Sequence, residues 1–154
     1  MMETKAKEFE ERVKGFPTVC RRYGVKATSQ RSEIYRELVG TKEHPDAETV
    51  YTRVRKRIPA ISLDTVYRTL RLFEKKGLIS RVGSLGERAR FDADTDRHHH
   101  FVCTECGFIG DIYNQEWNDV RAPSDVRIWG TVNSIHVEAR GLCKACQKKQ
   151  RVKE

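Results

Sequence analysis

The chain has 154 residues, with 30 lysines and arginines against 22 aspartates and glutamates and a formal net charge of +8. Its N-terminus leads into a charged segment and not into a secretory signal, and no stretch is long and apolar enough for a membrane span. We therefore expect a soluble cytoplasmic protein of one medium or two small domains.

The basic residues are unevenly distributed along the chain. Residues 1–91 hold 21 basic and 12 acidic side chains, whereas residues 92–154 hold 9 and 10. This change of charge predicts two domains, 1–91 and 92–154. A basic first domain favours a polyanionic partner such as DNA, although a solvated charged surface would give the same count.

The first half of the chain has the apolar spacing of amphipathic helices. Residues 6–24 predict a helix that Pro17 interrupts, and Cys20 falls on its apolar face, where we interpret it as a small buried hydrophobe. Thr28 is expected to cap a second helix through Leu38, and a third helix is expected over 46–57.

A fourth helix is predicted between an N-cap at Ser62 and a stop at Gly77. One face of this helix is apolar and is expected to pack inward: Leu63, Val66, Leu70 and Phe73. A second face is polar and is expected to meet DNA: Asp64, Tyr67, Arg68, Arg71 and Lys75. Lys26 and Arg31 are candidate DNA contacts from the second helix and the turn before it.

Two short strands are predicted after this helix, over 78–82 and 87–91, joined by a turn at 83–86. Arginines lie along both strands. Two helices joined by a short turn and followed by such a hairpin predict a winged helix-turn-helix, so we expect double-stranded DNA as the partner.

Two Cys-x-x-Cys pairs occur in the last third of the chain: Cys103 with Cys106, and Cys143 with Cys146. A two-residue spacer lets both sulfurs of a pair reach one ion from a tight turn, and two pairs complete a tetrahedral shell. We expect one structural Zn²⁺ per chain. Disulfides or unrelated thiols are the alternative, and nothing secretory accompanies these cysteines.

Histidines and aspartates form a second cluster between the predicted wing and the cysteines. If residues 98–103 form a strand, His98 and His100 project from one face and His99 from the other. Asp111, on the strand after the first cysteine turn, can approach the first two histidines. This pattern indicates another metal site, with a polar strand end as the alternative.

The chain resembles the ferric uptake regulator (Fur) superfamily of bacterial metal-dependent repressors. The resemblance is carried by the segments that begin at Thr28-Ser29-Gln30-Arg31, Thr65-Val66-Tyr67-Arg68 and Gly141-Leu142-Cys143. It implies an α+β architecture, in which an N-terminal winged helix-turn-helix domain precedes a small α/β dimerisation domain with structural zinc. A homodimer on a palindromic operator is therefore expected, with an interface near strands at 109–112 and 132–137.

The resemblance also implies a regulatory site that bridges the two domains and holds one Fe²⁺ or Mn²⁺ per chain. Its ligands, carried over position by position, are His44, Asp92, His98, His100 and Asp111. Members that sense iron commonly carry Glu at the position of Asp111, whereas the peroxide-sensing branch carries Asp. The resemblance therefore implies a peroxide-responsive repressor in which His44 or His98 becomes oxidised, with a reversible iron-responsive repressor as the alternative.

Some positions depart from the family pattern. Ser29 replaces a proline that is common there, and Arg68 is more typical of iron sensors. A further metal site of some relatives is not predicted, because its positions hold Arg97, His99 and Asn118, with His136 only near the fourth. A remote alternative is a zinc nucleobase deaminase, since His136-Val137-Glu138 precedes Cys143-x-x-Cys146, but Leu142 stands where that motif has proline.

Overall fold

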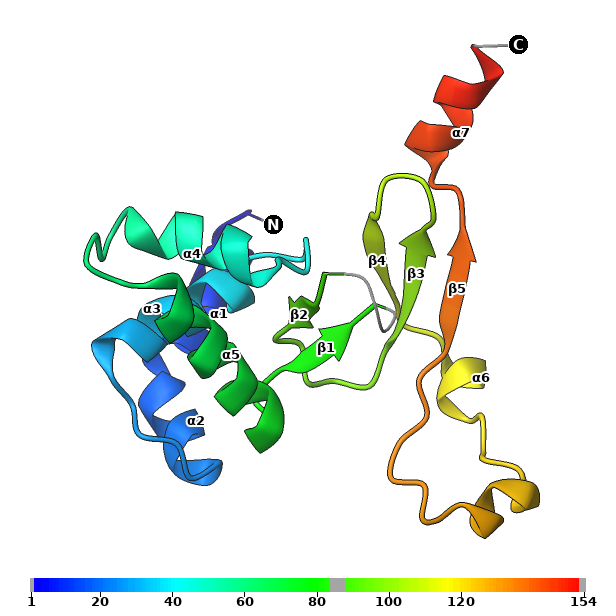
Figure 1. The fold of residues 1–154 in the computed structure, drawn as a ribbon, viewed down its shortest axis with the longest axis horizontal. Helices are drawn as coiled ribbons and strands as arrows, with labels where there is room; N and C mark the ends of the chain where they lie inside the picture. Colours follow the sequence, from blue (N-terminus) through cyan, green and yellow to red (C-terminus); the bar gives the residue numbers. More distant parts are fainter. Residues whose placement is uncertain (1, 84–87, 153–154) are drawn as a thin grey trace. The chain divides into compact units, whose positions relative to one another are not determined.

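The structure is a computed structural model that describes residues 2–83 and 88–152 (Figure 1). The chain divides into two compact units, Met1–Thr95 and Asp96–Glu154, and each is described by itself. Within the described residues, no helix combines the length and the apolar character needed to cross a membrane.

The first unit is built mainly from helices, which run in the order α1 (Met2–Lys14), α2 (Phe16–Arg22), α3 (Ser29–Val39), α4 (Ala47–Arg55) and α5 (Leu63–Lys76). The predicted interruption of the first helix is present, but it falls at Gly15 and not at Pro17. Pro17 is accommodated in the first turn of α2, where a backbone N–H has no partner within the helix and its loss costs little.

Side-chain caps explain where these helices begin; those at Thr28 and Ser62 are predicted from the sequence, and Asp46 supplies a third. Each cap uses a side-chain oxygen to accept a backbone N–H three residues on: Thr28 from Arg31 at 3.3 Å, Asp46 from Thr49 at 2.8 Å, and Ser62 from Thr65 at 3.1 Å. Gly77 ends α5 in the left-handed region at φ 79°. Glycine reaches this conformation without a Cβ clash, so the stop is encoded locally.

Three aromatic rings form the centre of the first unit's core. Phe16 stacks on Tyr35 with centroids 4.8 Å apart, and Phe73 meets Phe16 edge-on at 5.9 Å. The inner face of α5 is buried as predicted at Val66, Leu70 and Phe73, each 0% exposed. Leu63, which the sequence predicts to point inward, is only half-buried. Thr69, which is not predicted to face the core, is buried.

The predicted wing strands are present but short. Strand β1 (Ser80–Val82) pairs antiparallel with β2 (Arg90–Asp92), and Val82 lies opposite Arg90. The turn that the sequence predicts between them falls largely on residues 84–87, which lie outside the described residues.

The second unit contains a three-stranded sheet with the order β4-β3-β5 (Figure 1). Its elements are β3 (His99–Cys103), β4 (Ile109–Ile112), α6 (Gln115–Asn118), a 3₁₀ helix η1 (Ser124–Ile128), β5 (Glu138–Gly141) and α7 (Lys144–Arg151). Strand β3 pairs antiparallel with β4 and parallel with β5.

The strand expected near 132–137 is wrong, because β5 begins only at Glu138. The backbone N–H of Val137 donates to Nδ1 of His99 at 3.1 Å and is therefore taken by a side chain. Regular ladder pairing between β3 and β5 starts with His100 opposite Glu138. The strand expected at 109–112 is confirmed as β4.

Candidate metal centres and the exposed face of α5

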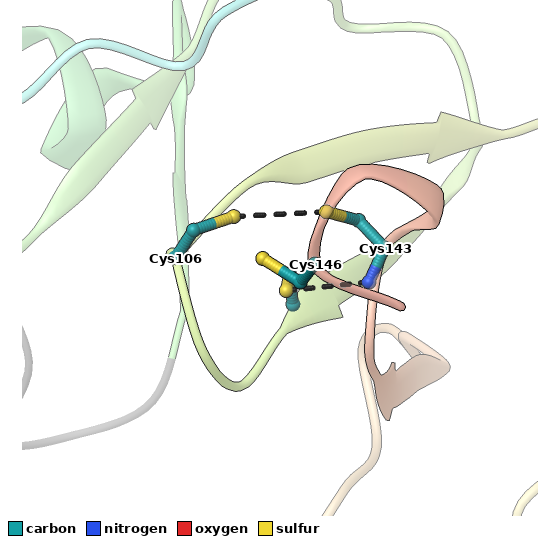
Figure 2. A group of neighbouring side chains, drawn as sticks. Cys106, Cys143 and Cys146 are labelled. Atoms are coloured by element: carbon teal, nitrogen blue, oxygen red, sulfur yellow. Dashed lines mark hydrogen bonds between the residues drawn. The ribbon is translucent and has the colours of Figure 1, made fainter. Parts of the chain in front are cut away.

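The four paired cysteines converge within the second unit, with sulfur atoms that all lie within 4.8 Å of one another. Cys103 ends β3, Cys106 lies in the turn to β4, Cys143 is the N-cap residue of α7, and Cys146 lies in its first turn. Figure 2 shows the side chains of Cys106, Cys143 and Cys146 turned toward a common point, with the first two sulfurs 3.7 Å apart. Tetrahedral zinc with Zn–S bonds of about 2.3 Å sets neighbouring sulfurs at about 3.8 Å.

The electrostatics of this cluster also favour a cation. Backbone N–H groups of Cys106 and Cys143 hold the pKa of the Cys103 thiol at about 6. The nearby sulfurs of Cys106 and Cys143 raise the pKa of Cys146 to about 12. Thiolates this close repel one another, so all four can ionise together only beside a positive ion. The donor set and its spacing therefore fit Zn²⁺.

A second set of donors in the same unit lies at the start of β3 and on β4. The Nε2 atoms of His98 and His100 are 3.0 Å apart, and each is 3.8 Å from Oδ1 of Asp111. His98 Nδ1 lies 2.7 Å from the carbonyl oxygen of Asp96, to which it donates as an N–H. This hydrogen bond leaves the Nε2 lone pair of His98 directed toward His100 and Asp111, which is the arrangement of a ligating imidazole.

The first unit contains a smaller set of the same chemistry. His44 Nε2 lies 3.3 Å from Oδ2 of Asp92, and the two residues are 2% and 7% exposed. Asp92 ends β2, and its other oxygen accepts the backbone N–H of Asp94 at 2.7 Å. An imidazole and a carboxylate at this separation can pair with each other or bind one cation together.

The five predicted regulatory ligands thus fall into two groups, called half-sets here, one in each unit. His44 and Asp92 form one half-set in the first unit, and His98, His100 and Asp111 form the other in the second unit. Nitrogen and oxygen donors of this kind fit Fe²⁺ or Mn²⁺ better than the softer metals that prefer thiolates.

The strand alternation predicted for the three histidines is confirmed for His99. Its ring is 0% exposed and packs edge-on against Trp117 at 5.7 Å, whereas the rings of His98 and His100 approach each other to 4.6 Å. The imidazole of His99 therefore has a structural role, because its Nδ1 accepts the N–H of Val137. Cys20, interpreted as a buried hydrophobe, is 1% exposed, and burial raises its pKa.

The polar face of α5 is exposed, as the sequence predicts. Asp64, Tyr67, Arg68, Arg71 and Lys75 are all exposed, with Tyr67 at 41%. Arg68 forms a long ion pair, 3.5 Å, with Asp64 one turn earlier. Exposed charges held this loosely are free to rearrange around a phosphate or a base edge.

Two further basic residues expected at DNA are Arg31 in the first turn of α3 and Lys26 in the segment before that helix. Arg31 donates from Nη1 to the backbone carbonyl of Lys26 at 2.8 Å, and the side chain of Lys26 is exposed. The arginine thus organises the turn that precedes α3.

Two arginines of the hairpin, Arg81 and Arg88, form ion pairs with acidic side chains of the same unit. Arg81 donates twice to Glu74, at 3.0 Å each, and Arg88 pairs with Glu48 at 2.8 Å and with Asp46 at 3.4 Å. Arg81 and Arg88 remain exposed on the hairpin, as the sequence predicts, and their charges are partly offset by these acidic partners.

Comparison with known proteins gives consistent matches. A sequence model described as the ferric uptake regulator family matches residues 22–128. The peroxide-responsive repressor PerR of Staphylococcus aureus is 33% identical over 129 residues, which cover 84% of this chain and 87% of that protein.

Solved structures extend the match to the fold. The ferric uptake regulator of Helicobacter pylori, described with three functional metal-binding sites, matches with a TM-score of 0.70 at 25% identity. The match covers 90% of this chain and 93% of that protein's chain. A Campylobacter jejuni peroxide stress regulator has a TM-score of 0.66 at 30% identity and covers 84% of this chain and 97% of its own.

Proposed function

Because the chain belongs to the ferric uptake regulator family, we propose that it is a DNA-binding repressor whose regulatory metal makes it responsive to peroxide. Members of this family are metal-responsive regulators and not enzymes, so the nucleobase deaminase alternative is wrong. That motif also fails locally, because Cys143 and Cys146 gather with Cys103 and Cys106 in a closed set that leaves no position for a substrate.

The cysteine set is assigned to one structural Zn²⁺ per chain. Its ligands come from the β3–β4 turn and from the start of α7, so an ion there ties the end of the chain to the sheet. A closed tetrahedral shell of thiolates has no position at which peroxide or substrate could bind.

The regulatory Fe²⁺ or Mn²⁺ is assigned to His44 and Asp92 together with His98, His100 and Asp111. The observation that carries this assignment is the convergence of His98 and His100 on Asp111, with the His98 tautomer fixed by the Asp96 carbonyl. Only five residues lie between Asp92 and His98, which keeps the two half-sets close in sequence. An ion shared by both half-sets would restrain the DNA-binding unit relative to the other unit.

Peroxide sensing follows from the chemistry of the ligand side chains. Bound Fe²⁺ would supply one-electron reduction of hydrogen peroxide beside its own ligands, whereas bound Mn²⁺ would not. The net change would consume one hydrogen peroxide: one of its oxygens is inserted into the C–H bond between the two ring nitrogens of His98 or His44, giving 2-oxo-histidine, and the other leaves as water. The altered ring would bind the metal poorly, and the protein itself would be consumed.

A modest change in metal affinity is enough to operate such a switch. A DNA-competent state that is minor without metal becomes dominant once the ion favours it by a few kcal/mol, and about 5.5 kcal/mol moves a 1:99 ratio to 99:1. Loss of one imidazole ligand can remove a large part of that difference.

The proposed DNA partner is a palindromic duplex bound by a homodimer. Tyr67, Arg68 and Arg71 on the exposed face of α5 are the proposed reading residues, with Lys26 and Arg31 contributing phosphate contacts. A single winged helix buries little DNA surface, so two copies gain affinity together. Strands β4 and β5 are the two edges of the sheet, and β4 is part of the expected dimer interface.

A reversible iron-responsive repressor is the second candidate, favoured by Arg68, which resembles the residue of iron sensors. Peptide mass spectrometry after Fe²⁺ loading and one equivalent of peroxide separates the two functions. We expect one added oxygen on His44 or His98, no addition on His99 in the same peptide as His98, and no addition after Mn²⁺ loading. Unmodified site histidines, together with unchanged DNA affinity, would assign the protein to the iron-responsive class.

The Asp111→Glu variant is the matched control for this experiment. It keeps a carboxylate and changes only its reach, as in iron-sensing relatives. We expect it to retain metal-dependent DNA binding but to accumulate less oxidised histidine than the wild type under the same peroxide dose.

A further inference from the structure

His44 occupies a backbone conformation that requires outside support. Its φ is 50°, and it is the non-glycine residue with positive φ among the described residues. Side chains with a Cβ rarely adopt this left-handed conformation, and the following Pro45 restricts His44 further. A strained residue persists only where the surrounding structure determines its geometry, and such residues concentrate at ligand sites.

The support comes from one arginine on β2. Arg90 donates from Nη2 to the carbonyl oxygen of Glu43 at 2.6 Å and from Nε to the carbonyl oxygen of His44. Two N–H groups of one planar guanidinium thus hold two consecutive carbonyls of the strained loop. Lysine could not reproduce this, because its ammonium is a single point donor without a fixed fork.

The backbone of β2 reinforces the same attachment. The N–H of Phe91 donates to the carbonyl of Pro45 at 3.1 Å, and Asp46 forms an isolated bridge with Arg90. The strand that holds the His44 loop also ends with Asp92, two residues after Arg90. One short strand therefore fixes both members of the first unit's half-set.

We propose that Arg90 is a positioning residue for the regulatory metal, which holds the His44 loop in the geometry that presents its imidazole beside Asp92. This inference rests on the proposed regulatory site. Arg90 does not bind the ion; it acts through the two backbone carbonyls, and its contribution should vanish when the His44 imidazole is absent.

The test is a double-mutant cycle on Mn²⁺ affinity, measured by electron paramagnetic resonance of free Mn²⁺ with zinc-loaded protein. Arg90→Gln is expected to weaken Mn²⁺ binding at least tenfold, and Arg90→Lys is expected to restore only part of the loss. In a His44→Ala background, Arg90→Gln should cause no further loss. The Co²⁺ absorption spectra of the two single variants should change in the same way.

Arg81→Gln is the matched control, because Arg81 lies on the same hairpin but directs its guanidinium to Glu74 on α5 and not to the His44 loop. It should leave Mn²⁺ affinity within twofold. Zinc content and the thermal unfolding midpoint of each variant verify that it is folded. If Arg90→Gln is unstable, the Mn²⁺ affinity of the conservative Arg90→Lys variant tests the same contact.

The outcomes separate the inference from the function on which it rests. If His44→Ala weakens Mn²⁺ binding and Arg90→Gln does not, or if their fold losses multiply in the double variant, the positioning role is wrong and the regulatory site stands. If His44→Ala leaves Mn²⁺ affinity unchanged, both the site and the role of Arg90 are wrong.

Discussion

The two candidate metal sets of this chain use different ligands drawn from different parts of the fold. The four cysteines belong to one unit and lie in two tight turns, so their geometry is complete within that unit. The histidines and aspartates form half-sets in two units, and the proposed function has both of them bind one ion. A closed set inside one unit can stabilise a fold, whereas a divided set can regulate one.

The largest expected effect comes from opening the cysteine set. Cys143→Ser should lose zinc and unfold the second unit, because structural zinc in small peptides contributes an apparent binding free energy of about 10–16 kcal/mol. Metal analysis and circular dichroism check this. Cys20→Ala, which removes a buried thiol from the other unit, should keep one zinc per chain, and retention of zinc by Cys143→Ser would contradict a four-thiolate site.

The next largest effect is expected from removing the regulatory metal from the histidine and aspartate ligands while zinc stays bound. A mild chelator that leaves zinc in place should weaken operator binding by roughly 5- to 150-fold, the range of about 1–3 kcal/mol of coupling between two sites. Added Mn²⁺ should restore the affinity. Fluorescence anisotropy with operator DNA measures both states, and equal affinities with and without Mn²⁺ would remove the regulatory role.

A smaller effect is expected on the exposed face of α5. Arg71→Ala should weaken DNA binding by about 1–3 kcal/mol if the arginine reads a base. If it contacts a phosphate, the slope of log affinity against log salt concentration should fall by about 1. Filter binding across a salt series distinguishes these outcomes. Lys7→Ala, an exposed change on α1, serves as a charge-matched control that should not alter the salt slope.

The smallest effect concerns the start of α5. Ser62→Ala removes the oxygen that accepts the Thr65 N–H and should lower the free energy of unfolding by about 1 kcal/mol. Ser62→Asp should keep most of the stability, since Asp caps equally well. Denaturant unfolding of zinc-loaded protein measures both variants, and zinc content should not change in either.

The helices of the first unit were predictable because their signals are local. Thr28, Asp46 and Ser62 each bond a backbone N–H three residues away, and Gly77 supplies the left-handed stop, so short windows of sequence contain the information. The cysteine set was equally accessible, because Cys-x-x-Cys spacing already determines how two sulfurs can share an ion.

Features fixed by distant contacts were not predictable in this way. The start of β5 depends on the ring of His99 binding Val137, 38 positions away, and no local periodicity reports such a bond. The attachment of Arg90 to the His44 loop joins residues 46 positions apart. His44 is predicted as a ligand from the family resemblance and not from the spacing of residues in the sequence.

The most direct test of the divided site is the stoichiometry of Mn²⁺ binding to zinc-loaded protein by equilibrium titration. We predict one tight exchangeable Mn²⁺ per chain in the wild type, with that single site weakened both by His44→Ala in the first unit and by His98→Ala in the second. Two independent sites, or a site that survives intact when His44 is removed, would show that the half-sets do not share an ion.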